Sequence, residues 1–180
     1  MPDATGLELI AHELQEAVPG SVEGTLHYRG TATLIVNGEQ LLEALRWLGD
    51  EPSQGYRFLA SLHAADYLPA EPRFAVHYEL LNMERVERLH VKAPLADVAS
   101  PDVDGNLPEI DSCVALFPTA DFQEREAYDM FGIHFRGHPD LRRILLPDEY
   151  GGFPQRRDFP MGGEPVLFTH NEIEAPRWFE

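Results

Sequence analysis

The chain has 180 residues, which is enough for one compact domain with a continuous core. Its 43% apolar content argues against global disorder, and no segment approaches the roughly 18 uninterrupted apolar residues of a membrane-spanning helix. The net charge of −17 argues against direct binding to nucleic acid or to an anionic membrane surface, because both depend on basic groups.

Two further features restrict the chemistry and the compartment. The single cysteine, Cys113, excludes an intramolecular disulfide, a cysteine-based zinc site and an iron–sulfur cluster held by this chain alone. The first six residues show no basic region followed by an apolar run, so we expect no secretory signal and a cytoplasmic chain. Its expected partners are therefore other proteins.

The N-terminal part of the chain predicts a helix, a hairpin and a second helix. Residues 7–18 repeat apolar side chains at helical spacing and stop at a Pro-Gly pair. Residues 22–36 are rich in Thr and Val, which is typical of two short strands about a central Arg-Gly turn. Residues 39–48 predict a second amphipathic helix that ends at Gly49.

Three extended segments follow, over residues 57–68, 73–83 and 85–94. Their partial alternation of apolar and polar side chains predicts an antiparallel meander with one face covered by the helices. We therefore expect an α+β fold: a two-layer domain in which two N-terminal helices lie on a mainly antiparallel sheet.

The C-terminal third predicts a loop, a helix and an extended tail. Residues 99–110 have the composition of a loop, and residues 119–131 predict a helix with Thr119 as N-cap and Gly132 as its end. We expect the Pro- and Gly-rich chain beyond it to be ordered only where it packs against another protein surface. We predict three parts: an α+β domain over 1–118, a helix and turn over 119–145, and a partner-docking tail over 146–180.

The predicted helix places charged groups in unusual positions. Glu124 falls within its apolar face, where a carboxylate is costly unless a donor meets it, and Arg142 or Arg143 is the nearest plausible donor. Arg125 and Asp129 lie four residues apart on another face, where they either pair or are solvated. We favour structural pairing of Glu124 over acid–base catalysis, because no second catalytic group lies at a convincing spacing.

Two histidines in the turn after the helix resemble a metal pair only in spacing. His134 and His138 are four residues apart, but the glycines and the proline around them argue against a helix, and no third ligand is indicated. We expect His138 to satisfy backbone groups of the turn. The glycine pairs further on match no nucleotide-binding motif.

A short segment of the tail, residues 154–160, carries two arginines and an aspartate between two prolines. Arg156, Arg157 and Asp158 are there either a solvated turn or a rigid, arginine-bearing docking segment.

The stretch EREAYDMFGIHFRGHPDLRRILLP resembles the signature of the 30-kDa family, the C subunit, of NADH-quinone oxidoreductase (respiratory complex I). Every position of that pattern is filled here, by Glu124, Arg125, Glu126, Asp129, Met130, Phe131, His138, Arg142, Ile144 and Leu145. The stretch YGGFPQRRDFPMGG is similar to the family's continuation. The resemblance is strong from about residue 116 to 163, whereas the N-terminal part matches only in length and element order.

The resemblance implies a non-catalytic subunit of the peripheral arm of a proton-translocating NADH:quinone oxidoreductase. It implies docking on the D subunit of that complex, with the B subunit nearby, at the cytoplasmic face of the cell membrane and without a membrane span. It implies no catalytic residue, no metal and no cofactor in this chain, because FMN and the iron–sulfur clusters are expected in partner subunits.

On this basis we predict a motif and interface set, in which the helix carboxylates pair with arginines of the turn or of a partner and fix where the tail leaves the domain. The set consists of Glu124, Arg125, Glu126, Asp129, Met130, Phe131, His138, Arg142, Arg143, Arg156, Arg157 and Asp158. If Arg156 and Arg157 dock on a partner, their replacement by Ala weakens assembly and leaves the melting temperature of the isolated domain unchanged.

Three other functions stay open from the sequence. In the first, the chain is the equivalent subunit of a related membrane-bound hydrogenase or of a dehydrogenase with another electron donor, which the neighbouring genes would reveal. In the second, it is a hydrolase using Glu124 and a His, which needs a pocket formed by this chain alone. In the third, it is a stand-alone acidic adaptor, which binds proteins but never co-purifies with iron–sulfur subunits.

Overall fold

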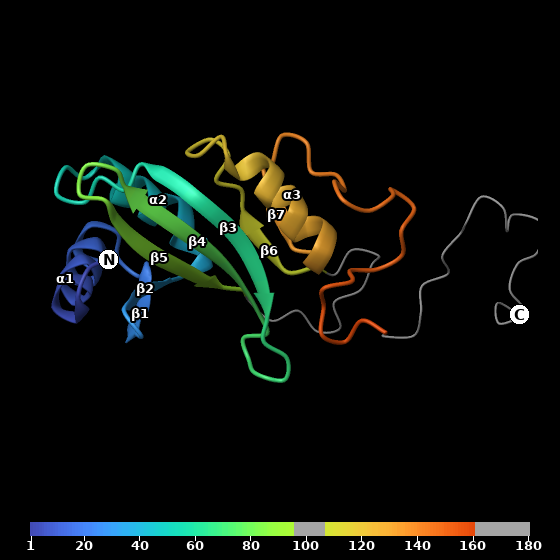
Figure 1. Cartoon of the computed structure of the whole chain (residues 1–180), viewed down its shortest axis with the longest axis horizontal. Helices are drawn as coiled ribbons and strands as arrows, with labels where there is room; N and C mark the ends of the chain where they lie inside the picture. Colours follow the sequence, from blue (N-terminus) through green and yellow to red (C-terminus); the bar gives the residue numbers. More distant parts are fainter. Residues whose placement is uncertain (96–106, 161–180) are drawn as a thin grey trace, which may run out of the picture.

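The computed structural model describes residues 1–95 and 107–160, and Figure 1 traces them from the N-terminal helix to the segment that curves around the last helix. Most of the predicted loop over 99–110 and the last part of the predicted tail, 161–180, lie outside the described residues. The elements in chain order are α1 (Ala4–Ala17), β1 (Val22–Tyr28), β2 (Thr31–Val36), the 3-10 helix η1 (Gly38–Gln40), α2 (Leu41–Asp50), β3 (Phe58–Asp66), β4 (Phe74–Asn82), β5 (Glu87–Pro94), β6 (Glu109–Asp111), α3 (Ala120–Phe131) and β7 (His134–Arg136).

The two N-terminal helices form where the apolar spacing predicts them. Helix α1 begins after Asp3, whose carboxylate accepts a hydrogen bond from the Gly6 N–H at 2.7 Å and satisfies a free donor of the first turn. Each helix turns one apolar stripe inward: Leu7, Ile10, Ala11 and Leu14 from α1, and Leu41, Ala44, Leu45 and Leu48 from α2.

The main sheet has five strands in the order β1-β2-β5-β4-β3. The predicted hairpin is β1–β2, which turns through Arg29 and Gly30 at φ values of 50° and 80°. The predicted meander is β3–β4–β5, and all these pairs are antiparallel. Hairpin and meander are joined by a parallel pairing of β2 with β5, which leaves β3 at one edge of the sheet.

One face of the sheet forms the core with the two helices. Its buried side chains include Leu34, Val76, Tyr78, Leu89 and Val91, which lie in one cluster with the inward stripes of α1 and α2. Burial of these side chains is the main favourable contribution to the free energy of folding. The expected two-layer α+β fold is confirmed.

The other face of the same strands carries a chain of hydrogen-bonded polar side chains. The Tyr67 hydroxyl lies 2.9 Å from His77 Nε2, and His77 Nδ1 lies 2.8 Å from His90 Nε2. The chain ends where His90 Nδ1 lies 3.1 Å from the Thr33 hydroxyl, and the ring of His63 stacks on His77 at 5.0 Å. Burial, helped by repulsion from the neighbouring His and Lys groups, lowers the pKa of His77 to about 3.

The C-terminal part adds α3 and a two-stranded parallel sheet, β6–β7, beside β3 (Figure 1). Thr119 is the N-cap residue, as predicted, but it makes no side-chain cap, because its hydroxyl donates to the Leu59 carbonyl at 3.4 Å. Gly132 ends the helix with a φ of 67°. Ala120 and Phe135 belong to the same core cluster as the N-terminal elements, and the division at residue 118 stays a prediction.

Candidate functional site

Asp129 joins α3 to the turn that follows β7. Its fully buried carboxylate accepts hydrogen bonds from the N–H groups of Ile144, Leu145 and Leu146 at 3.0, 2.7 and 2.9 Å. The guanidinium of Arg143 adds an ion pair at 2.7 Å. Burial alone would raise the pKa of Asp129, but these donors outweigh it and lower that pKa.

Arg125 contacts the same turn as Asp129 but binds other groups of it. Only 9% exposed, it donates to the carbonyls of Arg142 and Arg143, each at 3.2 Å. Of the two alternatives for Arg125 and Asp129, a mutual pair or solvation, neither occurs, because the turn over 142–146 brings carbonyls to the arginine and N–H groups to the aspartate. The two residues hold opposite sides of the same backbone turn.

Glu124 is fully buried, as its place on the apolar face predicts, but its partners differ from the predicted arginines. One carboxylate oxygen accepts from the Ser112 hydroxyl at 2.6 Å and the other from the Cys113 N–H at 2.7 Å. Burial raises the pKa of Glu124 more strongly than these donors and the nearby His138 lower it. The prediction of Arg142 or Arg143 as its partner is wrong, because both belong to the Asp129 turn.

His138 satisfies backbone groups of the turn, as predicted. Its Nδ1 accepts the Asp140 N–H at 3.0 Å, and its Nε2 lies 3.2 Å from the Asp121 carbonyl. The side chain is fully buried, 4.0 Å from a Glu124 oxygen. Within residues 1–95 and 107–160, no three His, Cys, Asp or Glu side chains come together in a way that could hold a metal ion.

The described part of the tail is fastened to the end of α3. Arg156 donates from Nε to the Phe131 carbonyl at 2.6 Å, and the Gln155 N–H donates to the Met130 carbonyl at 3.1 Å. Arg156 is 8% exposed and lies over the ring of Phe153. The guanidinium of Arg156 is therefore not solvated, because it binds carbonyls of its own chain at a helix end, and docking of this segment on a partner stays a prediction.

A second fastening lies at the end of β3. Arg73 pairs with Asp66 at 2.8 Å and with Asp158 of the tail at 2.7 Å, while the Arg157 N–H donates to Asp66 at 2.9 Å. The hydrogen bond from Arg73 is the main reason that the pKa of Asp158 is lowered. Two residues that the sequence analysis did not select, Asp66 and Arg73, thus hold the tail.

Two members of the motif, Glu126 and Arg142, have exposed side chains. Glu126 is exposed and has no hydrogen bond or ion pair within the described residues. Among residues 1–95 and 107–160, the only ion-pair partner of the Arg142 side chain is Asp140, which is also exposed. Two apolar side chains stand near them in the chain, Phe122 at 63% and Leu145 at 62% exposure.

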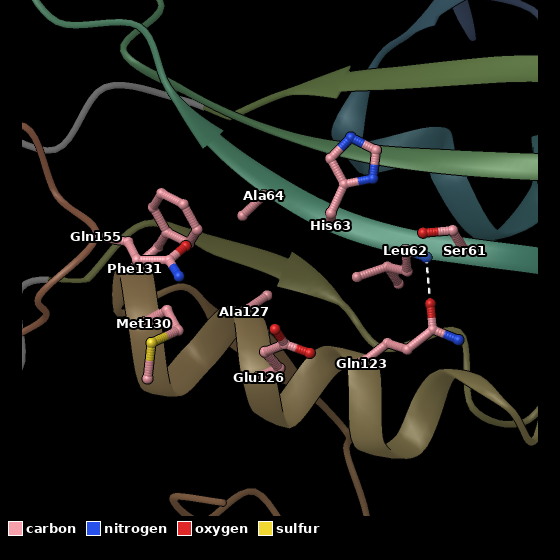
Figure 2. A pocket seen from close by; sticks show the side chains of 10 residues that line it. All are labelled: Ser61, Leu62, His63, Ala64, Gln123, Glu126, Ala127, Met130, Phe131 and Gln155. Atoms are coloured by element: carbon pink, nitrogen blue, oxygen red, sulfur yellow. Dashed lines mark hydrogen bonds between the residues drawn. The ribbon is translucent and has the colours of Figure 1, made fainter. Parts of the chain in front are cut away.

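A groove separates α3 from the edge strand β3 (Figure 2). Its volume is about 250 Å³, and its lining residues include Ala64, Glu126, Ala127, Met130, Phe131 and Gln155. At one end the Gln123 side-chain carbonyl accepts the Leu62 N–H and closes the gap. Met130 and Phe131, both predicted as motif residues, form its apolar wall.

Comparison with known proteins places this geometry in a family. A family model described as "Respiratory-chain NADH dehydrogenase, 30 Kd subunit" matches residues 34–165, which include the whole motif. The chain belongs to this 30-kDa subunit family. Its relatives include the C subunit of NADH-quinone oxidoreductase from Roseiflexus sp. (strain RS-1), 38% identical over 96% of this chain and 92% of the relative. The C subunit from Herpetosiphon aurantiacus is 47% identical over 79% of each chain.

Solved structures show the same fold. A trypsin-resistant fragment of Nqo5 matches with a TM-score of 0.56 and 29% identity, over 75% of this chain and 98% of the fragment. A chain of the archaeal membrane-bound sulfane sulfur reductase matches with a TM-score of 0.66 over 86% of this chain, but at 23% identity this likeness shows the fold alone. No helix in the described part of this 30-kDa subunit family member is long and apolar enough to cross a membrane.

In this member of the 30-kDa subunit family the motif divides into two groups. Buried members hold the chain together: Glu124, Arg125, Asp129, Arg143 and Arg156 all bind groups of the chain itself. Exposed members, chiefly Glu126, Arg142 and Arg157, have side chains on the surface. Sequence reasoning did not separate the groups, because the partners Ser112, Cys113 and Phe153 carry no distinctive pattern.

Proposed function

We propose that this chain is a non-catalytic, peripheral-arm subunit of a proton-translocating NADH:quinone oxidoreductase. It supports the transfer of electrons from NADH, through FMN and iron–sulfur centres of other subunits, to quinone. The observation that carries the proposal is the family match over residues 34–165, together with the C-subunit relatives that are similar over nearly their whole length.

The geometry of the carboxylates supports a structural role over a catalytic one. Glu124 has no exposed surface, and both its oxygens accept hydrogen bonds from Ser112 and Cys113. A general acid or base must come within hydrogen-bond reach of the proton that it transfers. A substrate in solvent cannot come within that distance of the enclosed Glu124 carboxylate. Asp129 is equally enclosed by the turn after β7. Asp129 thus holds the turn from which the tail leaves, and Glu124 holds the segment at Ser112 and Cys113 that precedes α3.

The exposed groups and the tail then form the docking surface of this proposal. The D subunit of the complex is the expected main partner, with the B subunit nearby, and the chain is peripheral at the cytoplasmic face of the membrane. Arg142, Arg157 and Leu145 stand on the surface beside the fixed turn and tail, so they meet a partner in a preset geometry. Preorganised contacts of this kind bind with little loss of conformational entropy.

Affinity purification tests the proposal. The tagged full-length chain is recovered from native membranes in mild detergent, its companions are identified by mass spectrometry, and NADH-dependent quinone reduction is assayed in the eluate. We expect co-elution of the D and B subunits with that activity. Recovery of the chain alone, or with the subunits of a hydrogenase, would contradict the proposal and leave only the family and the fold.

A further inference from the structure

The edge strand β3 leaves backbone groups unpaired beside α3. The Leu62 N–H points away from β4, since it donates to the Gln123 side chain on α3. Backbone groups of a strand alternate in direction, so the N–H and C=O of Ala64 also point away from β4. Within the described residues no group forms a hydrogen bond with this N–H or C=O of Ala64. An open edge of this kind is a template for one more extended segment.

The groove at this edge has room and an apolar wall. It holds about 250 Å³ between Ala64 on the strand and Ala127 and Met130 on the helix. Phe131 and Gln155 stand at its far end, opposite Gln123 (Figure 2). A short extended segment is thus met by backbone groups on one side and by apolar side chains on the other, as in strand addition to sheet edges.

Charge indicates what occupies the groove. Glu126 lines it with an exposed carboxylate that has no partner in the described part of the chain. Residues 161–180 carry four Glu and one Arg, and a second copy of the chain would bring a net charge of −17. Both of these occupants would place more negative charge beside Glu126, whereas a basic segment of another protein complements it.

We propose that the groove between β3 and α3 binds an extended, Lys- or Arg-bearing segment of a partner protein. The segment pairs with the backbone of Ala64, lays an apolar side chain on Met130 and Phe131, and places its cation on Glu126. The inference rests on the proposed docking function and deepens it by naming the kind of segment that docks.

Photo-crosslinking in the assembled state tests this. A photoreactive phenylalanine replaces Gln155, whose side chain is exposed at the groove, or Glu43 on the surface of α2 as a control position. The full-length tagged chain is expressed in its native host, the membranes are irradiated, the chain is purified, and crosslinked peptides are identified by mass spectrometry. We expect position 155, and not position 43, to crosslink to one peptide of another protein with a Lys or Arg near the attachment point.

Variants separate a specific site from mere proximity. Glu126→Gln should lower the crosslink yield about fivefold, the effect of losing one salt bridge of moderate strength, while Glu126→Asp keeps most of it. Glu43→Gln removes the same charge elsewhere and should leave the yield unchanged. Ala64→Pro removes the outward N–H at an edge position where proline is tolerated, and should lower the yield as well.

Each contrary result overturns the proposal in a recognisable way. A crosslink from position 155 to residues 161–180 or to a second copy of the chain identifies a different occupant. An assembled, active complex without a crosslink at position 155 shows an empty groove and leaves the proposed function standing. Purification of the chain without any partner removes both proposals together.

Discussion

Asp129 is the single residue on which most of the turn after β7 depends. Asp129→Asn leaves one side-chain oxygen, which can meet either the N–H groups of residues 144–146 or Arg143, and it removes the negative charge that pairs with Arg143. We expect a loss of about 3 kcal/mol or more in the free energy of unfolding, measured by urea titration. Asp148→Asn, an exposed change in the same segment, is the control. A loss below about 1 kcal/mol would show that the carboxylate does not hold the turn.

Gly132 combines a positive φ with close packing, and the two effects can be measured separately. An added Cβ at Gly132 would lie 2.4 Å from the Phe153 ring and 2.6 Å from the Arg156 guanidinium, whereas at Gly137, with a φ of 78°, it meets nothing. Gly137→Ala should therefore cost only the backbone strain, about 1 to 2 kcal/mol. We expect Gly132→Ala to lower the melting temperature clearly further. Equal losses of melting temperature in both variants would show that Phe153 and Arg156 do not pack closely against Gly132.

The imidazole chain on the face of the sheet opposite α1 and α2 makes stability depend on pH. The pKa of His77 is about 3 in the folded chain and 6.5 in the unfolded one, so between these values the unfolded chain binds more protons. The contribution of His77 to the free energy of unfolding is complete above about pH 6.5 and is lost as the pH falls. The loss reaches about 2 kcal/mol at about pH 5. The groups around His77 are His63, His90, Lys92 and Glu79. The test is therefore the difference in the pH dependence of the free energy of unfolding between the unaltered chain and His77→Gln. A steep fall in stability shared equally by both would assign the effect to other groups.

At the scale of elements, the described tail is part of the folded unit rather than a free arm. Arg156 is buried and binds the Phe131 carbonyl, while the Arg157 side chain is exposed. We expect Arg156→Ala to destabilise the isolated chain by about 2 to 3 kcal/mol, because it leaves buried carbonyls without a donor. Arg157→Ala should change stability by less than about 0.5 kcal/mol. Thermal unfolding of both variants tests this difference. Equal melting temperatures of the two variants would show that Arg156 does not hold the tail on α3.

The elements that sequence patterns predict are those whose cause is local. Apolar spacing predicts α1, α2 and α3 within a few residues, and alternation predicts the hairpin and the meander. The parallel pairing of β2 with β5 was not predicted, since it joins strands that are more than fifty residues apart. For the same reason the helix predicts that Glu124 is buried but not that Ser112 and Cys113 meet it. Asp66, Arg73 and Asp158 likewise come together only in the folded chain.

At the scale of the whole molecule, the described residues share one core and carry the motif in two layers. In the inner layer, Asp129 joins the turn after β7 to α3, and Glu124 joins α3 to the segment at Ser112 and Cys113. The outer layer, with Glu126 and Arg142, faces outward. The motif alone identifies the family. The roles of its individual residues follow only from the fold, because one stretch of sequence contains both the buried and the exposed residues.

In the proposed function, this chain supports electron transfer by docking and not by chemistry of its own. The most direct measurement is NADH–quinone turnover per FMN in membranes of a strain that lacks the chain and carries Glu126→Gln, Arg142→Ala or the unaltered chain. We expect the variants to lower the amount of assembled complex, while turnover per FMN in the complex that does assemble stays unchanged. Full assembly with a lowered turnover per FMN would contradict it and assign the chain a part in the reaction.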